Sequence, residues 1–175
     1  MLIIISIIGL LSTSMLTNQR SSAGRRQLNL DVQKVAQDIR KAQNSALASQ
    51  LTPASQLTPA CSSKIMPHGV IFSVDSPGFY LYVADCDESK TANEGDILNI
   101  VVLSESRIIA LSAPYAPPSA VVLLNIFFNP PLPQLWINGN PIPAAKAAGI
   151  RICHAKFTTL CKTIFLSSKG AVSIQ

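Results

Sequence analysis

Acidic side chains gather in one stretch of the chain at a spacing that suits a calcium loop. Asp85, Asp87 and Asp96 take positions one, three and twelve of such a loop, where carboxylate oxygens coordinate Ca²⁺. Lys90 occupies the position where the sharp turn of the loop needs glycine. An acidic surface loop after a strand is the commoner origin of this pattern. We therefore expect no cofactor or metal, with calcium kept as the alternative.

The histidines and serines do not form a pattern that predicts catalysis. His68 and His154 lie in unrelated stretches, without a carboxylate or cysteine at a spacing that defines a metal or catalytic site. We expect both at the surface or at a strand edge. The serines within residues 104–106 and 167–168 lack a nucleophile-elbow context, and no glycine-rich phosphate loop precedes a helix. The expectation is a protein that is not an enzyme.

The four cysteines are spaced for disulfide bonds rather than for zinc. Cys61, Cys86, Cys153 and Cys161 form no CxxC or paired Cys/His motif. An even number of cysteines favours disulfides outside the cytoplasm, and four reduced buried thiols are the alternative. We expect Cys153–Cys161, because this pair flanks a turn near Lys156, and Cys61–Cys86 as the second bridge.

These candidate residues need a scaffold, and composition limits its size. The chain has 175 residues, 48% hydrophobic residues and a net charge of +5. One domain fits into residues 61–175. The first half of this domain is acidic, and no acidic residue follows Glu105. Such asymmetry can bind an anionic polymer or stack identical subunits. DNA is not favoured, since aromatic residues do not alternate with the basic ones.

The chain begins with an apolar run, MLIIISIIGLLSTSML, and the first charged residue is Arg20. At about 1.5 Å per residue, residues 1 to about 17 would cross most of a bilayer core of roughly 30 Å. Residues 1–20 therefore predict a transmembrane or filament-core helix. An uncharged helix can leave lipid only for another apolar environment, such as a bundle of like helices. Ile7 and the small residues Gly9 and Ser12 would pack in that bundle.

Residues 21–51 continue this helix as an amphipathic stalk. Apolar side chains recur at steps of three and four, which predicts a buried stripe of Leu28, Val32, Val35, Ala36, Ile39, Ala42, Ala46 and Leu47. The face predicted to meet water carries Asp31, Lys34, Asp38, Arg40 and Lys41. The hexapeptide SQLTPA then occurs twice in succession, and its Thr-Pro steps predict an extended connector over residues 52–60.

Short apolar runs separated by turn residues predict a β-rich domain over residues 61–175. The turn residues 75–78 predict a hairpin between residues 68–74 and 79–85. Further runs lie at 97–111, 121–129 and around the tight turn Asn138-Gly139, and the C-terminal strands form a meander with turns near Lys156 and at 168–170. The predicted fold class is α+β: one long N-terminal helix packed by its distal half on one or two mostly antiparallel sheets. Trp136, Phe127 and Phe128 are expected in the core or on a sheet face.

Several segments carry a family resemblance that runs along most of the chain. IIISIIGLL, which includes Gly9, resembles the N-terminal segment of pilins, and LNLDVQKVAQDIRKAQNSALAS resembles the stalk of secretion-type pseudopilins. The segments HGVIF, FYLYVAD, IFFNPPLPQLWING and TIFLSSKGAVSIQ are similar to the β-rich head of a pseudopilin subgroup. The chain thus resembles a type IV pilin-like protein, in particular a minor pseudopilin.

The resemblance implies a pilin-like fold and a non-catalytic structural role. The expected function is a subunit of a type IV pilus or of a type II secretion-like pseudopilus, with length and a β-rich head favouring a minor subunit. Its partners would be other pilin or pseudopilin subunits, a prepilin peptidase, an assembly platform and membrane lipid. The expected location is the cell membrane, single-pass with the head outside the cytoplasm, and then the filament.

Family members begin with a basic leader that ends in glycine, then a Phe-like residue that becomes methylated, then a Glu. These would lie before Met1. We expect a start codon assigned too late, because Arg20, Arg25 and Arg26 all follow the apolar run and would otherwise hold the head in the cytoplasm. Loss of processing is the other explanation.

Two other classes of function stay open. One is a secreted or membrane-tethered β-rich binding module, whose first residues form a signal peptide cut near Ser22-Ala23-Gly24. It is disfavoured because no charged residue precedes the apolar run and the helical pattern resumes after the cut. The other is an extracytoplasmic enzyme.

Overall fold

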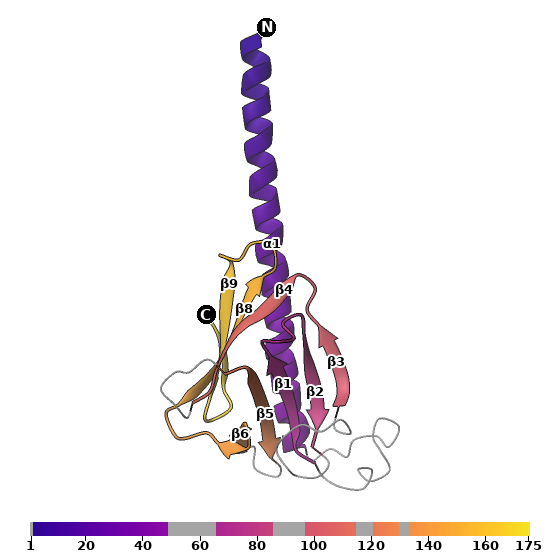
Figure 1. Ribbon diagram of the computed structural model, residues 1–175, viewed down its shortest axis with the longest axis vertical. Helices are drawn as coiled ribbons and strands as arrows, with labels where there is room; N and C mark the ends of the chain where they lie inside the picture. The colour runs from indigo at the N-terminus through magenta and orange to yellow at the C-terminus, as the bar shows by residue number, and fades with distance from the viewer. Residues whose placement is uncertain (1, 49–65, 86–96, 115–120, 130–133) are drawn as a thin grey trace.

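The computed structural model describes residues 2–48, 66–85, 97–114, 121–129 and 134–175, with backbone alone for 2–18 and 20. A single helix, α1 (Leu2–Leu47), runs through the head and projects far beyond it (Figure 1). Among the described residues, no helix is both long and apolar enough to cross a membrane. The residues of the connector and the start of the domain, 49–65, lie outside the described residues, so the head is traced from Met66.

The distal half of α1 buries the predicted apolar stripe. The side chains with at most 3% exposure are Leu28, Val32, Val35, Ala36, Ile39, Ala42 and Ala46. These positions follow the three- and four-residue steps of one helical face, which explains why the pattern alone found them. Leu47 was predicted on the stripe, and this is wrong. Its side chain is 48% exposed, at the last residue of the helix.

The head consists of two antiparallel sheets packed around α1. The larger sheet has the order β3-β2-β1-β5-β6-β7. Its strands are β1 (His68–Ser73), β2 (Phe79–Ala84), β3 (Ile97–Val102), β5 (Leu123–Asn129), β6 (Gln134–Ile137) and β7 (Asn140–Pro141). The smaller sheet has the order β10-β9-β8-β4. Its strands are β4 (Ser106–Ser112), β8 (Ala147–His154), β9 (Cys161–Ser167) and β10 (Val172–Ile174). The α+β prediction, with a helix on a pair of antiparallel sheets, is confirmed.

Turn residues in the sequence join consecutive strands into hairpins. The segment 75–78 joins β1 to β2, as predicted, and β8, β9 and β10 form the predicted meander. Asn138 and Gly139 join β6 to β7 with φ angles of 48° and 77°, the left-handed conformation that Asn and Gly tolerate best. Gly170, with φ of 78°, plays the same part between β9 and β10.

Strands β3 and β4 are neighbours in the sequence but belong to different sheets. The chain crosses from one sheet to the other at residues 103–105. The β1–β2 turn holds this crossing in place, because Gly78 O accepts a hydrogen bond from Leu103 N and Pro77 O accepts one from Ile108 N. The crossing therefore brings the start of β4 close to both the helix and the smaller sheet.

The larger sheet is apolar on both faces. Its inner face packs on α1 through residues such as Val70, Phe72 and Phe128. On the outer face, Ile71, Val83 and Phe127 form a second buried cluster, with Leu81 and Trp136 packed against it. The aromatic residues of β5 and β6 thus take core or sheet-face positions, as expected. A strand apolar on both faces reads as a continuous run, which is the pattern of VVLLNIFF.

Candidate functional site: the junction of helix and head

The predicted packing residues of the projecting helix have no described side chains. Ile7, Gly9 and Ser12 belong to the helical backbone of α1, and nothing more is described of them. Cys61, Cys86, Asp87 and Asp96 lie outside the described residues. The second disulfide and the calcium loop therefore stay predictions.

Asp85, the first residue of the calcium candidate, is fully buried at the end of β2. Its backbone N–H donates to Pro67 O at 2.9 Å. Within the described ranges, which leave out residues 86–96, no group of three or more His, Cys, Asp or Glu side chains lies close enough to hold a metal ion. Burial of Asp85 at a strand end already gives this residue a structural role.

The bridge Cys153–Cys161 is present, as predicted. The two cysteines are direct cross-strand partners in β8 and β9, with Cα atoms 4.0 Å apart. The disulfide closes the hairpin loop 154–160, the segment that meets the helix. It thereby removes conformational freedom from the part of the smaller sheet that has to hold its position against α1.

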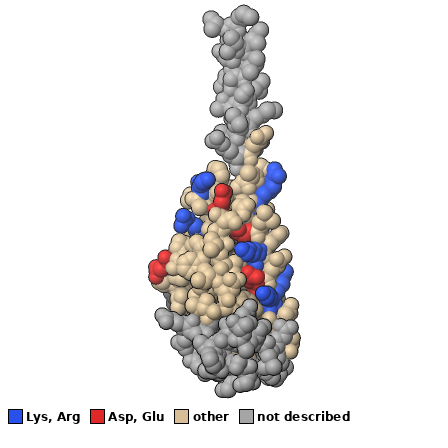
Figure 2. Space-filling view, turned by 90° about the vertical axis from the view of Figure 1, so that its right-hand side faces the viewer, with Lys and Arg blue, Asp and Glu red and all other residues tan. Residues whose placement is uncertain are grey.

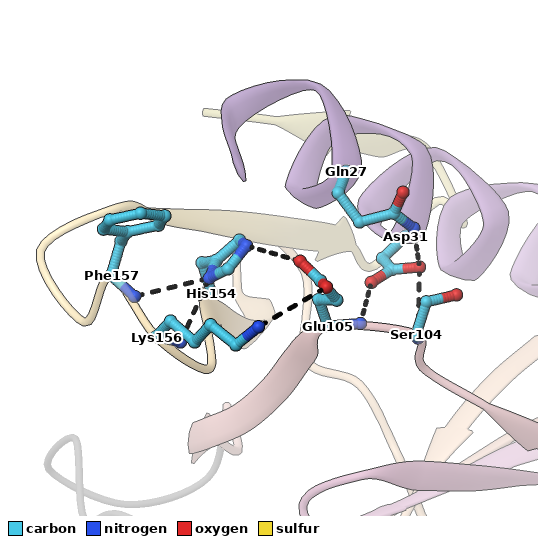
Figure 3. Close-up of polar contacts among 7 residues, drawn as sticks. All are labelled: Gln27, Asp31, Ser104, Glu105, His154, Lys156 and Phe157. Carbon is cyan, nitrogen blue, oxygen red and sulfur yellow. Dashed lines mark hydrogen bonds and ion pairs between the residues drawn. The ribbon is translucent and has the colours of Figure 1, made fainter. Parts of the chain in front are cut away.

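His154 was predicted at the surface or at a strand edge, and this is wrong, because it is a buried residue of β8, which lies between β4 and β9. Its side chain is 1% exposed. Its Nδ1 accepts hydrogen bonds from the backbone N–H groups of Lys156 and Phe157, at 3.1 and 3.3 Å (Figure 3). These two donors assign the proton to Nε2, which donates to Glu105 Oε2 at 3.1 Å. Sequence spacing missed this pair because the fold brings together residues 49 positions apart.

Glu105 ties the hairpin loop to the crossing between the sheets. Its backbone oxygen accepts from Ala155 N at 2.7 Å, and its carboxylate lies 3.9 Å from Lys156 Nζ. Both ring nitrogens of His154 are engaged in hydrogen bonds, so the pair fixes the loop. His68, also predicted at the surface or a strand edge, is 4% exposed, with its ring 6.3 Å from that of Tyr82.

The third partner at the junction is Asp31 of α1, which was predicted to face water. This prediction is wrong, because Asp31 is 3% exposed. Its carboxylate accepts hydrogen bonds from the backbone N–H groups of Ser104 and Glu105, at 3.5 and 3.4 Å, and from Gln27 Nε2 at 3.5 Å (Figure 3). A carboxylate that accepts backbone N–H groups is satisfied when buried. Asp31 thus fastens the crossing segment to the helix.

Gly24 lets the hairpin loop approach the helix closely. A Cβ added at this residue would lie 2.8 Å from Phe157 Cδ2 and 3.2 Å from His154 Nε2. The rings of Phe157 and His154 stack at a tilt, with centroids 5.0 Å apart. Glycine at this position therefore leaves room for an aromatic ring against the helix. We call the set Gly24, Asp31, Glu105, His154 and Phe157 the junction.

Tyrosines of β2 hold the helix at a second level. Tyr80 donates from its hydroxyl to Asp38 Oδ2 at 2.6 Å, and Asp38, which was predicted to face water, is half-buried beside it. Tyr82 lies 3.4 Å from Ser45 through its hydroxyl, and Lys41 Nζ stands 5.1 Å from the ring centroid. Burial raises the pKa of Tyr80, and the hydrogen bond to Asp38 and its charge raise it further. Burial likewise raises the pKa of Tyr82.

The sequence did contain a signal that the two aspartates lie on the packed face of the helix. Asp31 lies three residues after Leu28 and four before Val35, so it belongs to the helical face of the stripe. Asp38 repeats this placement one heptad later. A carboxylate at such a position needs hydrogen-bond donors from the packed domain. Their identity, Tyr80 and the N–H groups at 104–105, depends on tertiary structure.

The junction fixes the head on the distal half of a helix whose other half projects. Comparison with known proteins gives no match among family models, curated proteins or solved structures. The function is therefore argued from the helix, the junction and the sequence of the projecting half.

Proposed function

We propose that this chain is a non-catalytic structural subunit, of the minor kind, in a type IV pilus or a type II secretion-like pseudopilus, and that it assembles through its N-terminal helix. The observation that carries the proposal is the division of α1. One helix of 46 residues holds a head by its distal half and projects with its other half (Figure 1). The pilin-like fold is part of this proposal.

The projecting half supplies the assembly surface. Its sequence is uncharged up to Arg20 and mostly apolar up to Leu16, and the head does not extend along it (Figure 1). Such a helix is stable only in an apolar environment, which lipid provides before assembly and a bundle of like helices provides after it. Gly9 and Ser12 would allow close helix contact there, and Ile7 would pack between helices.

The junction supports a helix that stays attached to its head. A signal-peptide cut near Ser22-Ala23-Gly24 would sever α1 where Gly24 packs on Phe157 and His154. In a filament subunit, the same contact fixes the direction in which the head leaves the helix. We therefore place the binding-module function second.

A location outside the cytoplasm is part of the proposal. The disulfide Cys153–Cys161 supports it, since disulfides persist in oxidising compartments. The proposed partners are like subunits, a prepilin peptidase, an assembly platform and membrane lipid. Membrane anchoring before assembly would place the subunit where an assembly platform can extract it.

A charge in the projecting half tests the proposal. In cells that express the intact system, Gly9→Asp should remove the chain from the sheared surface-filament fraction, because a buried charge in a helix bundle lacks a partner. The matched control is Gly78→Asp, the same substitution in the β1–β2 turn, where an added Cβ meets nothing within 4 Å. The control chain should stay in the fraction.

Mass spectrometry of the native chain, from the filament fraction and from the soluble fraction, can contradict the proposal directly. If the native chain is soluble and begins near Ala23 or Gly24, the apolar run is a removed signal and the binding-module function replaces this proposal. Equal recovery of Gly9→Asp and Gly78→Asp would also contradict assembly through the helix.

A further inference from the structure

Strand β3 is the end strand of the larger sheet. Among the described strands it pairs with β2 only. Leu103 N donates to Gly78 O on the β2 side, so the alternation of an antiparallel ladder turns the backbone groups of Val102 and Ile100 away from β2. Val102 O accordingly accepts from Lys34 Nζ of α1, at 3.4 Å. These outward groups are the template that an added strand requires.

The outer face beside this edge is apolar and exposed. Val102 is 64% exposed and Ile100 is 58% exposed, and both point to the same face of the sheet. Their cross-strand partners are Phe79, 36% exposed, and Leu81. The sequence of β3, ILNIVV, contains none of the Lys, Glu or Pro residues that usually protect an edge strand. We call these four side chains the edge strip.

Two lysines of α1 lie along the inner side of the same edge. Lys34 reaches Val102 O, and Lys41 stands over the ring of Tyr82, whose partner in β3 is Asn99. Seven helical residues span about 10.5 Å, and the three strand residues from Asn99 to Val102 span about 10 Å. The two lysines are therefore spaced along the helix as their contacts are spaced along the edge of the sheet.

Asp38 lies between the two lysines on α1 and accepts the Tyr80 hydroxyl, and its charge offsets part of theirs. Figure 2 looks onto the side of the molecule where β3 lies in Figure 1, and it shows a largely uncharged area with basic and acidic side chains around it. The inner side of the β3 edge thus carries two lysines and one aspartate, a net positive charge, and the outer side presents the edge strip.

We propose that the β3 edge binds an extended segment of another polypeptide in which apolar residues alternate with carboxylates. The segment pairs with the outward backbone groups of Ile100 and Val102 as an additional strand. Its apolar side chains extend the edge strip, and its carboxylates lie on the opposite face, over Lys34 and Lys41. Successive side chains of a strand point to opposite faces, so an alternating sequence meets both demands at once.

Charge decides between this occupant and a second copy of the chain. Two β3 edges paired with each other would bring Lys34 and Lys41 of both copies to one seam, and like charges there oppose pairing. A segment with carboxylates relieves the same charges. This inference goes beyond filament assembly and does not depend on it.

The test uses the full-length chain and two capped synthetic octapeptides, one alternating valine with glutamate and one alternating valine with lysine. We expect the glutamate peptide to bind, measured by fluorescence anisotropy of a labelled peptide, and the lysine peptide to bind at least about tenfold more weakly, as steering by charge predicts. Ile100→Pro removes an outward N–H, which an edge strand tolerates, and should abolish binding.

The double variant Lys34→Glu/Lys41→Glu keeps the edge and should reverse the preference of the two peptides. Its matched control is Lys169→Glu, in the β9–β10 turn, which should bind as the wild type does. Thermal unfolding of each variant checks that the head is folded. Equal binding of both peptides, binding that survives Ile100→Pro, or self-association through β3 in place of peptide binding would overturn the proposal.

Discussion

The two halves of α1 differ in what surrounds them. The distal half, from Gly24 onward, packs on both sheets and carries carboxylates that accept hydrogen bonds from the head. The projecting half has an apolar sequence and stands clear of the head in Figure 1. The difference shows that the two halves of one continuous helix can have different roles. One part packs against the head and orients it, and the other is the part that we propose for assembly.

Shortening a side chain of the buried stripe should have the largest effect on stability. Ile39 is 0% exposed, so Ile39→Ala should lower the free energy of unfolding by about 2–5 kcal/mol. Ile7→Ala, the same substitution in the projecting half, should change it by less than about 0.5 kcal/mol. Urea denaturation of both variants measures this contrast. Similar losses of free energy of unfolding in the two variants would contradict the claim that the two halves of the helix have different roles.

Removing the Cys153–Cys161 bridge should have the second-largest effect on stability. Replacing both cysteines by serine frees the hairpin loop, whose ends are 8 positions apart, and should cost about 2–3 kcal/mol. The loss should be accompanied by faster amide hydrogen exchange at Lys156 and Phe157, because their N–H groups bond to His154 inside the loop. Unchanged exchange there would mean that the disulfide does not hold the junction.

Removing the carboxylate of Asp31 should cost less. Asp31→Ala leaves the N–H groups of Ser104 and Glu105 without their acceptor, an expected loss of about 1–3 kcal/mol. Asp31→Asn retains one oxygen acceptor and should lose less. Urea denaturation measures both Asp31 variants, and Asp75→Ala, at an exposed position, is the control. If Asp31→Ala matched Asp75→Ala, the junction would contribute nothing to stability.

The smallest effect is a change of stability with pH at the alkaline end. The pKa of Tyr80 is raised by burial, and by the hydrogen bond to Asp38 and its charge. Above pH about 10, the unfolded state therefore loses this proton while the folded state keeps it. Stability is fully present below that pH and should fall as pH rises, by at most about 1.4 kcal/mol per pH unit for this group. The stability of Tyr80→Phe should fall less steeply as pH rises. If its stability fell as steeply as that of the wild type, Tyr80 would not be the group responsible.

Much of the fold followed from local patterns. The stripe from Leu28 to Ala46 gave the buried helical face, and the turn residues at 75–78 and 138–139 placed the hairpins, since these signals act over a few residues. The Cys153–Cys161 bridge followed in the same way, as it closes a short loop.

Long-range contacts were not predictable in this way. The Glu105–His154 pair and the hydrogen bonds of Asp31 join segments 49 to 74 residues apart, and hydrophobic periodicity says nothing about which donors meet a carboxylate. The separation of β3 and β4 into two sheets also depends on the crossing segment being held by the helix and by the β1–β2 turn. The edge strip is a product of that separation.

The most direct test of the account is disulfide cross-linking of a Ser12→Cys variant in intact cells. Assembly through the projecting half predicts a covalent dimer of the chain on a non-reducing gel, which a reductant returns to the monomer, because one added cysteine can bond to only one neighbouring subunit. A chain that stays monomeric under oxidation while present at the surface, or a mature chain from which residue 12 has been removed, would contradict it.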